Sequence, residues 1–311
     1  MKLQQLRYIL EVAKHNLNIS EAAETLFTSQ PGISKQIRLL EEELGVLIFI
    51  RNGKRIVSIS EPGKAVLRIA GEMMRNAQNI KKIGDNFANT DSGSLSIATT
   101  HTQARYVLPK VVSEFLKAYP KVHLTIKQGS PAEACEMAMA GEVDFAIATE
   151  DLNEYKELAM LPCYDWNRSV IVPDGHPLLL KKDLLTLKDI ASYPLITYEF
   201  AFLPSSTIYQ AFQQEGLTPS VALSAVDTDV IKTYVRLGLG VGLLATMAYE
   251  PDRDDGIKLI NTEHLFHPST TKVALRYDCY LRGYAYHFIQ LFAPTLTREK
   301  VESVLYAPSD E

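Results

Sequence analysis

The pattern of apolar residues changes abruptly at residues 89–93, a polar Asn-Thr-Asp-Ser-Gly stretch, and this change constrains the fold more than any other feature. Before it, apolar residues recur at helical spacing. After it, short apolar strands alternate with helices. One chain therefore has to accommodate a helical N-terminal part and an α/β remainder, so the fold class is predicted to be α/β multidomain. The length of 311 residues agrees with two or three domains.

The first 45 residues are expected to form three helices separated by short turns. Apolar residues fit an amphipathic helix over about 2–15. Asn18, with a Glu three positions later, has the form of a capping box ahead of a short helix over 21–26. Residues 28–32 then predict a tight turn into a third helix, because a proline is tolerated in the first turn. That helix is expected to end at Gly45, since glycine favours a left-handed cap.

The third helix has a polar face that suits contact with DNA. Two short helices joined by a tight turn make a helix-turn-helix pattern, whose second helix enters the major groove. Hydroxyl, amide and cationic side chains reach base edges and phosphates there. The alternative is the solvated face of an ordinary helical hairpin. The side chains of this part expected to contact DNA are Thr28, Ser29, Gln30, Pro31, Ser34, Lys35 and Arg38.

A basic hairpin is expected directly after the helix pair. Two short β-prone runs flank an Asn-Gly pair, the strongest short-range hairpin signal. Arg51, Lys54 and Arg55 lie near its tip, where cations reach backbone phosphates or the minor groove. Residues 1–59 are therefore predicted to form a winged helix-turn-helix DNA-binding domain.

Residues 60–90 are expected to form a long linker helix and a hinge. Steps of three and four separate the members of an a/d seam. One interpretation is a helix lying on its own domain. The length of the seam favours the other, a dimerisation helix, and two-fold dimers match pseudo-palindromic half-sites. The seam consists of Val66, Ile69, Met73, Asn76, Ile80, Ile83 and Phe87.

Residues 91–311 are expected to form a two-lobed effector-binding domain. Predicted strands alternate with helices, and this order favours a parallel sheet covered by helices. A second set of the same kind follows, and a late strand returns to the first sheet. The result is a Rossmann-like, hinged unit similar to a periplasmic binding protein. The first lobe is assigned to 93–164 and 265–295, and the second to 165–264.

Two strands of the first lobe end in hydroxyl residues, and their ends predict a ligand cradle. In open α/β sheets, ligands bind beyond the carboxyl ends of the strands. The chain places Thr100, Thr102 and Gln103 there, and also Thr149. Hydroxyls, an amide and helix-start N–H groups suit a small anion or polar acid. The alternative for Thr102 is local helix capping, and Trp166, the only Trp, either lines the cleft or packs in a core.

The sequence offers little for catalysis or for binding a metal or cofactor. His101 has no partner to orient it as a base, so it is expected to be a capping or structural residue. Three glycines within 238–242 follow a helix and enter a strand, the reverse of a dinucleotide site, and predict a tight turn. Three widely spaced cysteines without a CxxC motif disfavour a disulfide framework and a zinc site. The chain is not expected to be an enzyme.

The net charge of −5 is unevenly distributed. Residues 1–90 carry 13 Lys and Arg against 9 Asp and Glu, and the remainder carries 19 against 28. A basic end favours a nucleic-acid-binding segment. The first residues lack an apolar signal segment and no apolar run reaches the ~18 residues of a membrane span, so a cytoplasmic location without a membrane partner is expected. The winged helix disfavours an exported solute receptor, and the missing phosphate fingerprint disfavours a Rossmann-type enzyme.

Several motifs resemble the LysR-type bacterial transcription regulators along the whole chain. Longer runs resemble the branch of that family that controls cysteine biosynthesis and sulfur assimilation. The family motifs are Ala22-Ala23, the run 29–34, Leu40-Glu41, Leu44-Gly45, Phe49, Arg51 and Pro62-Gly63. The branch motifs are the start of the chain and the runs 28–36, 98–106, 145–150, 161–168 and 229–242.

That resemblance implies a ligand-responsive activator of cysteine-biosynthesis and sulfur-assimilation genes. It implies binding to double-stranded promoter DNA as a homotetramer, a dimer of dimers, together with RNA polymerase. It implies N-acetylserine or O-acetylserine as effector, sulfate or thiosulfate as further ligands, and no cofactor. A sister regulator of sulfonate and sulfate-starvation genes is the alternative.

The ligand motif of that branch falls on the four cradle residues already named, with Trp166 nearby. One segment departs from the pattern. Relatives have Thr-Gly-Arg-Ser in a loop of the second lobe, where residues 203–206 of this chain read Leu-Pro-Ser-Ser. Either Ser205 or Ser206 substitutes for the missing hydroxyl, or the range of ligands differs.

Overall fold

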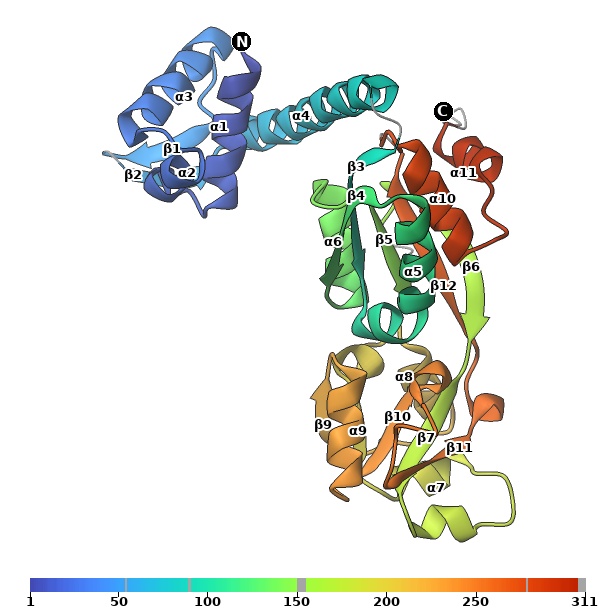
Figure 1. The fold of residues 1–311 in the computed structure, drawn as a ribbon. Coiled ribbons are helices and arrows are strands. Elements are labelled where there is room, and N and C mark those ends of the chain that lie inside the picture. Colours follow the sequence, from blue (N-terminus) through green and yellow to red (C-terminus); the bar gives the residue numbers. More distant parts are fainter. Residues whose placement is uncertain (54, 89–90, 150–154, 278, 307–311) are drawn as a thin grey trace. The chain divides into compact units, whose positions relative to one another are not determined.

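The structure, a computed structural model, describes residues 1–53, 55–88, 91–149, 155–277 and 279–306, with only the backbone of 85–88 (Figure 1). Two compact units make up the chain, one ending at Asp85 and the other beginning at Asn86. Helical and mixed α/β parts are both present, which confirms the predicted fold class. Among the described residues, no helix is long and apolar enough to cross a bilayer.

The N-terminal unit begins with the three predicted helices, α1 (Leu3–Lys14), α2 (Ile19–Thr25) and α3 (Gln30–Leu44). The Asn18 side chain accepts hydrogen bonds from two backbone N–H groups in the first turn of α2. Gly45 ends α3 with φ of +70°, a conformation that a residue with a Cβ adopts at a cost. Both caps lie where the sequence places them.

The predicted hairpin consists of β1 (Phe49–Asn52) and β2 (Arg55–Ile59), paired antiparallel. Asn52 lies opposite Arg55 in the register, so the turn is as tight as the Asn-Gly pair predicts. Phe49 is buried in the same apolar core as the three helices. The hairpin is therefore attached to the helices and is not an independent ribbon.

A single helix, α4 (Glu61–Ala88), follows the hairpin. Its first turns lie on their own domain, because Val66 and Ala70 belong to the N-terminal core cluster. Farther along the seam, Ile80 is 70% exposed, and Ile69, Met73 and Ile83 are exposed as well. The own-domain interpretation therefore holds only for the start of the helix. Phe87 is among the residues whose side chains are not described.

The first lobe contains a five-stranded sheet in the order β4-β3-β5-β12-β6. Strands β3, β4 and β5 are parallel as predicted, and β12 returns from the second lobe antiparallel to both its neighbours. Successive residues of β5 alternate between two cores, with Phe145 under α5 and α10 and Ala146 under α6 (Figure 1). The elements of this lobe are β3 (Ser92–Thr99), the π-helix η1 (Gln103–Val107), α5 (Leu108–Ala118), β4 (Lys121–Gln128), α6 (Pro131–Ala140), β5 (Phe145–Thr149), β6 (Leu158–Trp166), β12 (Ser269–Arg276), α10 (Gly283–Phe292) and α11 (Arg298–Leu305).

The second lobe contains a sheet in the order β11-β7-β10-β8-β9. Strand β8 is parallel to β9 and β10, and β7 is antiparallel to β10 and β11. The predicted glycine turn enters β10, where a Cβ on Gly240 would lie 2.4 Å from the Pro194 carbonyl oxygen. The elements are β7 (Arg168–Pro173), η2 (Pro177–Leu180), α7 (Leu187–Ala191), β8 (Leu195–Tyr198), η3 (Glu199–Phe202), α8 (Thr207–Gln214), β9 (Val221–Ala225), α9 (Thr228–Arg236), β10 (Val241–Ala245), η4 (Thr246–Ala248), β11 (Ile257–Asn261) and η5 (Glu263–Leu265).

The structure adds elements that the sequence pattern did not predict: β6, β11, α7, α11 and the π-helix. Strand β6 contains Pro162, and a proline is tolerated there because β6 is the edge strand of its sheet. The chain passes between the lobes twice, once at Asn167 and once between β11 and β12. These crossings place the carboxyl ends of β3 and β8 near each other.

Candidate functional site

The side chains predicted to contact DNA lie on α3, on the turn before it and on the hairpin. Gln30 donates a hydrogen bond to Ser34 Oγ at 3.1 Å, so these two side chains lie together at the start of the helix. The Ser29 hydroxyl accepts from the backbone of Gly32 as the cap of α3. Lys54 lies outside the described residues, and Ser34 is half-buried. The exposed members of the set are Thr28, Ser29, Gln30, Pro31, Lys35, Arg38 and Arg55.

Arg51 is held by an acidic residue of α3 and is less exposed than its neighbours on the hairpin. Its guanidinium lies 3.1 Å from Glu41, a buried carboxylate that also accepts from the backbone N–H groups of Ile48 and Phe49. This carboxylate fastens the hairpin to α3. Contact between Arg51 and DNA stays a prediction. In this structure its guanidinium is already paired with Glu41.

A groove of about 560 Å³ runs along the N-terminal unit beside the start of α3. Gln30 from α3 and Arg55 from the hairpin line it together, so the two predicted DNA-contacting elements border one concave surface. Its remaining walls come from the segment between α1 and α2, from the start of α2 and from β2. The other lining residues are His15, Asn16, Leu17, Asn18, Ile19, Ser20, Glu21 and Ile56.

A small cavity of about 30 Å³ lies between the two lobes of the second unit. All five residues predicted to bind a ligand line it, so the structure brings the whole set together. This volume is about the share of one water molecule in the liquid. The lining residues from the first lobe are Thr100, Thr102, Gln103, Gly129, Pro131, Thr149 and Trp166. Those from the second lobe are Tyr198, Phe200, Val226 and Ala245.

The second lobe contributes a wall that the sequence pattern did not predict. Tyr198 ends β8 and Ala245 ends β10, so both obey the carboxyl-end rule that located the cradle in the first lobe. Applying that rule to the second sheet could have identified them. The Phe200 ring stacks on that of Tyr198 with centroids 5.1 Å apart, and nothing in the sequence pattern pointed to this pair.

Thr102 joins the two lobes and does not cap its helix. Its hydroxyl lies 2.9 Å from the Thr228 hydroxyl and 3.3 Å from that of Tyr198, and makes no capping hydrogen bond. Tyr198 also bonds Thr228 at 3.0 Å and accepts from the backbone N–H of Ala245. The alternative of local capping is therefore wrong, because the hydroxyl is used by partners about a hundred residues away.

Gln103 is oriented by hydroxyl groups of its own lobe. Its Nε2 donates to Thr271 at 3.2 Å, and its Oε1 accepts from the hydroxyl of Tyr164. Burial raises the pKa of Tyr164, so that hydroxyl remains protonated and remains a donor. Thr149 lies 3.2 Å from the same Thr271 hydroxyl. The first lobe thus presents an ordered, uncharged set of donors and acceptors.

Trp166 both lines the cavity and packs against the crossover. The Arg168 guanidinium lies 4.6 Å from its ring centre, a cation–π distance, and donates to Ser269 at 2.8 Å. Burial lowers the pKa of Arg168 to about 10, so it is still charged at neutral pH. The indole Nε1 of Trp166 is buried and makes no hydrogen bond to protein. A donor is therefore available beside the cavity.

The segment that departs from the family motif does not reach the cavity. Leu203 is 54% exposed, and Ser205 is also at the surface. Ser206 is buried, but its hydroxyl caps α8 by accepting from the backbone of Ile208. Neither serine lines the cavity, so neither Ser205 nor Ser206 supplies the missing hydroxyl there. The second lobe's hydroxyl comes from Tyr198 instead.

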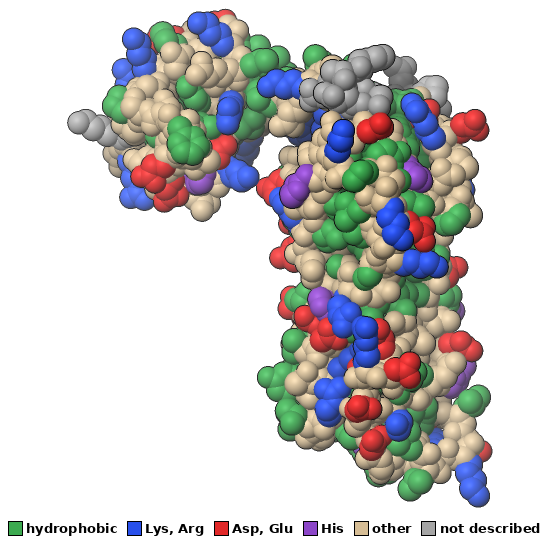
Figure 2. Space-filling view, viewed as in Figure 1, with side chains coloured by type: hydrophobic (Ala, Val, Ile, Leu, Met, Phe, Trp, Pro, Cys, Tyr) green, Lys and Arg blue, Asp and Glu red, His purple; other side chains and the backbone are tan. Residues whose placement is uncertain are grey.

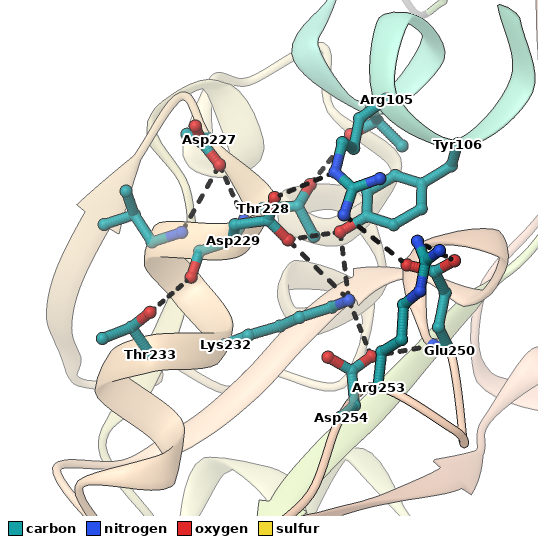
Figure 3. A network of polar contacts seen from close by, with 12 residues as sticks. Arg105, Tyr106, Asp227, Thr228, Asp229, Lys232, Thr233, Glu250, Arg253 and Asp254 are labelled. Atoms are coloured by element: carbon teal, nitrogen blue, oxygen red, sulfur yellow. Dashed lines mark hydrogen bonds and ion pairs between the residues drawn. The ribbon is translucent and has the colours of Figure 1, made fainter. Parts of the chain in front are cut away.

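A network of ionic groups joins the lobes beside the cavity (Figure 3). Residues Arg105 and Tyr106 from the π-helix meet Asp229 and Lys232 on α9. The pKa of Tyr106 is raised above its ordinary value by burial first and by its hydrogen bond to Asp229 second. His101 belongs to the same interface, because its Nε2 lies 3.2 Å from Asp227 of the second lobe. It is structural as expected, but it joins the lobes instead of capping a helix.

Metal and thiol chemistry have little support among the described residues. The side chains of His101, Asp227 and Asp229 place ligand atoms within 4.8 Å of one another, and inter-lobe ion pairs account for that grouping. No disulfide joins any of the three cysteines. Burial raises the pKa of the Cys135 and Cys163 thiols to about 12, which keeps them protonated at neutral pH.

Two family descriptions together match nearly the whole chain. Residues 3–64 match the description "Bacterial regulatory helix-turn-helix protein, lysR family", and residues 88–297 match "LysR substrate binding domain". Residues 65–87, most of α4, lie between the two matches, and the second match begins one residue before the polar stretch 89–93.

Two curated relatives and one solved structure are similar over long stretches. The transcriptional regulator SsuR of Burkholderia cenocepacia is 50% identical over 98% of this chain and 99% of its own length. The regulator CysB of the same organism is 49% identical over 98% of this chain and 97% of its own length. The crystal structure of the cofactor-binding domain of the Cbl regulator is 40% identical, with a TM-score of 0.66, and covers 70% of this chain and 96% of that one.

Proposed function

The chain belongs to the LysR family of DNA-binding transcriptional regulators, related to SsuR, CysB and Cbl, and from this premise we propose that it activates genes of cysteine biosynthesis and sulfur assimilation. LysR regulators bind promoter DNA and respond to a small-molecule effector. The families that match this chain and the relatives described above are regulators of transcription and not enzymes. The proposal therefore concerns which effector and which genes.

The observation that supports the effector proposal is the convergence of five side chains on one inter-lobe cavity. Thr100, Thr102, Gln103 and Thr149 supply neutral donors and acceptors, and Trp166 adds an indole N–H. Such groups suit a carboxylate or an oxyanion without needing a cation. N-acetylserine and O-acetylserine carry a carboxylate and further polar groups, and sulfate and thiosulfate are compact oxyanions.

The charge of this domain supports recognition by oriented neutral groups. Residues 91–311 carry more acidic than basic side chains, 28 against 19. On the face that Figure 2 shows, acidic and basic side chains of the lobes are interspersed and form no single basic patch. An anion is therefore not drawn in by bulk positive charge, and its binding depends on hydrogen-bond geometry.

The proposed assembly is a homotetramer, a dimer of dimers, on double-stranded promoter DNA in contact with RNA polymerase. Exposed seam residues on α4 and exposed donors on α3 support it. Two copies of the winged helix would read two half-sites. Effector binding would change the lobe arrangement, and the assembly would transmit that change to the DNA contacts.

Binding of each ligand class to the full-length protein tests the effector proposal. We expect calorimetry to detect N-acetylserine or O-acetylserine with the wild type, and Thr102→Val to weaken it by roughly tenfold or more, because one hydroxyl is lost and its partners stay buried. Thr125→Val on β4 is the matched control. Wild-type affinity in Thr102→Val would refute the assignment of this residue.

Promoter binding separates effector recognition from DNA recognition. Footprints on a cysteine-biosynthesis promoter are expected to change with acetylserine for the wild type and to stay constant for Thr102→Val. Arg38→Ala should weaken the footprint itself, because this exposed cation lies on the predicted DNA face. Loss of the footprint in Thr102→Val would place the residue in DNA binding or folding instead.

A second candidate function is control of sulfonate and sulfate-starvation genes. The similarity to the Cbl regulator of Escherichia coli supports it, because that protein is 42% identical over the whole of this chain. In that case sulfate, and not acetylserine, would change the footprint. The same calorimetric series, with sulfate and thiosulfate included, distinguishes the two candidates.

A further inference from the structure

The two lobes are held together by two short segments that lie beside the cavity (Figure 3). Residues 101–106 belong to the first lobe and residues 227–232 to the second. Between them run the Thr102–Thr228 hydrogen bond, the His101–Asp227 contact and the contacts of Tyr106. Each lobe thus contributes one segment to a shared polar strip.

Lys232 is the most deeply buried charge in this strip. Its side chain is 4% exposed, and its Nζ lies 2.7 Å from Asp254, which is also buried. The Nζ donates to the Tyr106 hydroxyl at 3.0 Å and lies 4.8 Å from the centre of that ring. The Tyr106 hydroxyl in turn donates to Asp229. The hydroxyl of Tyr106, from the first lobe, therefore bridges Lys232 and Asp229 of the second lobe by hydrogen bonds.

Arg105 reinforces the same contact from the first lobe. Its Nε lies 3.5 Å from Asp229, and its terminal nitrogen lies 3.9 Å from Glu250. Separation of the lobes would remove these partners together with the Tyr106 hydroxyl. Lys232 and Asp254 would keep each other, but the donor and acceptor roles of Tyr106 would have to be taken over by water.

The segment of the first lobe that makes this contact also lines the cavity. Thr102 and Gln103 line the cavity, while His101, Arg105 and Tyr106 point to the second lobe. These residues are consecutive in a helical stretch, so they move as one body. The cavity they enclose measures about 30 Å³, whereas small-molecule sites commonly measure hundreds. Effector entry therefore requires these lobes to part.

We propose that Tyr106 and Lys232 form an inter-lobe latch that holds the cavity contracted and gates the entry of effector. This proposal rests on the proposed function in one respect: it assumes that a small molecule binds in the cavity. Tyr106 is a positioning residue here, because it acts on the lobe arrangement and does not line the cavity.

Trp166 provides a test that needs neither effector nor DNA. It is the only tryptophan of the chain and lines the cavity, so acrylamide quenching of its fluorescence reports how open the lobes are. Tyr106→Phe keeps the ring and removes the hydroxyl that bonds two charged groups. We expect the closed-to-open ratio to fall by roughly tenfold, with a matching rise in quenching. Hydrogen exchange over 103–107 and 228–236 should accelerate in parallel.

Tyr284→Phe is the matched control, because that buried hydroxyl donates to the Ser94 carbonyl at 2.8 Å within the first lobe alone. Its quenching should equal that of the wild type. A second variant, Lys232→Met with Asp254→Asn, removes the buried charge pair without leaving one charge alone, and should also raise quenching.

Unchanged quenching and exchange in both latch variants would overturn the latch, and so would an equal rise in Tyr284→Phe. Thermal unfolding of each variant identifies any loss of folding, which would raise exchange throughout both lobes and not only in the two segments. Because none of these measurements uses acetylserine, failure of acetylserine to bind would refute the effector proposal and leave this test unaffected.

Discussion

Individual buried polar side chains hold distant backbone segments of this protein together. Glu41 is the clearest case in the N-terminal unit. It is 5% exposed and accepts hydrogen bonds from Ile48 and Phe49 N–H groups and from Arg51. A single charge on α3 therefore fixes where the hairpin begins.

Replacing Glu41 by Ala should destabilise the hairpin and the end of α3 by about 3 kcal/mol. Two buried N–H groups and one guanidinium would lose a charged acceptor, and such losses exceed those of neutral hydrogen bonds. Hydrogen exchange of amides in α3 and the hairpin of the full-length chain measures the change. Glu42→Ala, at an exposed position on the same helix, is the control. Equal protection in the two variants would contradict the expectation.

At the scale of elements, the faces of α4 and the carboxyl ends of the strands position the residues proposed to be functional. The first turns of α4 pack on the winged-helix core, and its later seam residues are exposed. In both lobes, the carboxyl ends of parallel strands deliver polar residues to the cavity, Thr100 after β3 and Tyr198 at the end of β8. The same rule of α/β sheets therefore operates twice, from opposite sides of one cavity.

Ile80→Asp should dissociate the proposed oligomer. Ile80 is 70% exposed on the seam, and in a two-stranded helix pair two copies would be buried. Loss of their burial and the introduction of two carboxylates should weaken association by roughly a hundredfold or more. Sedimentation velocity of the full-length protein measures it, and promoter affinity should fall with it.

Gln78→Asp is the control for this substitution, because it adds the same charge to the opposite side of α4. Its sedimentation should match that of the wild type. If Ile80→Asp sedimented as the wild type does, α4 would not be the association surface, and the exposed seam would need another partner.

At the scale of the whole molecule, function is divided between two units with separate cores. The winged-helix cluster contains residues from α1 to α4 only, and the three clusters of the second unit contain none of them. All residues that line the cavity also lie in the second unit. The proposed effector site and the proposed DNA-binding surface therefore belong to units with separate cores.

A fragment comprising residues 91–311 should fold and bind effector with an affinity within about twofold of the full-length chain, because it contains every core and cavity residue of the second unit. Calorimetry with the ligand that binds the wild type measures the affinity, and circular dichroism verifies folding. A folded fragment with tenfold weaker binding would mean that the N-terminal unit or the oligomer helps to form the effector site.

Local signals in the sequence determined a large part of this protein. Caps at Asn18 and Gly45, the Asn-Gly hairpin and the alternation of strands and helices depend on neighbours within a few residues, so they could be predicted from the chain alone. The first-lobe cradle could be predicted too, because strand ends in a parallel sheet meet at one edge. Edge strand β6 and its Pro162 could not, because only the order of the sheet makes a proline acceptable there.

Only the tertiary structure decided which side chains serve as partners across the lobes. Thr102 looked equally suited to capping a helix, and its use depends on Thr228, which is 126 residues away. Both Tyr106 and Lys232 lie within runs that resemble the family branch, but no local pattern predicted that they are partners, because only folding brings the two segments together and removes water from between them. Periodicity and capping act over a few residues and can be recognised in a sequence. Desolvated charge pairs and shared hydroxyls arise only where the fold brings distant segments together.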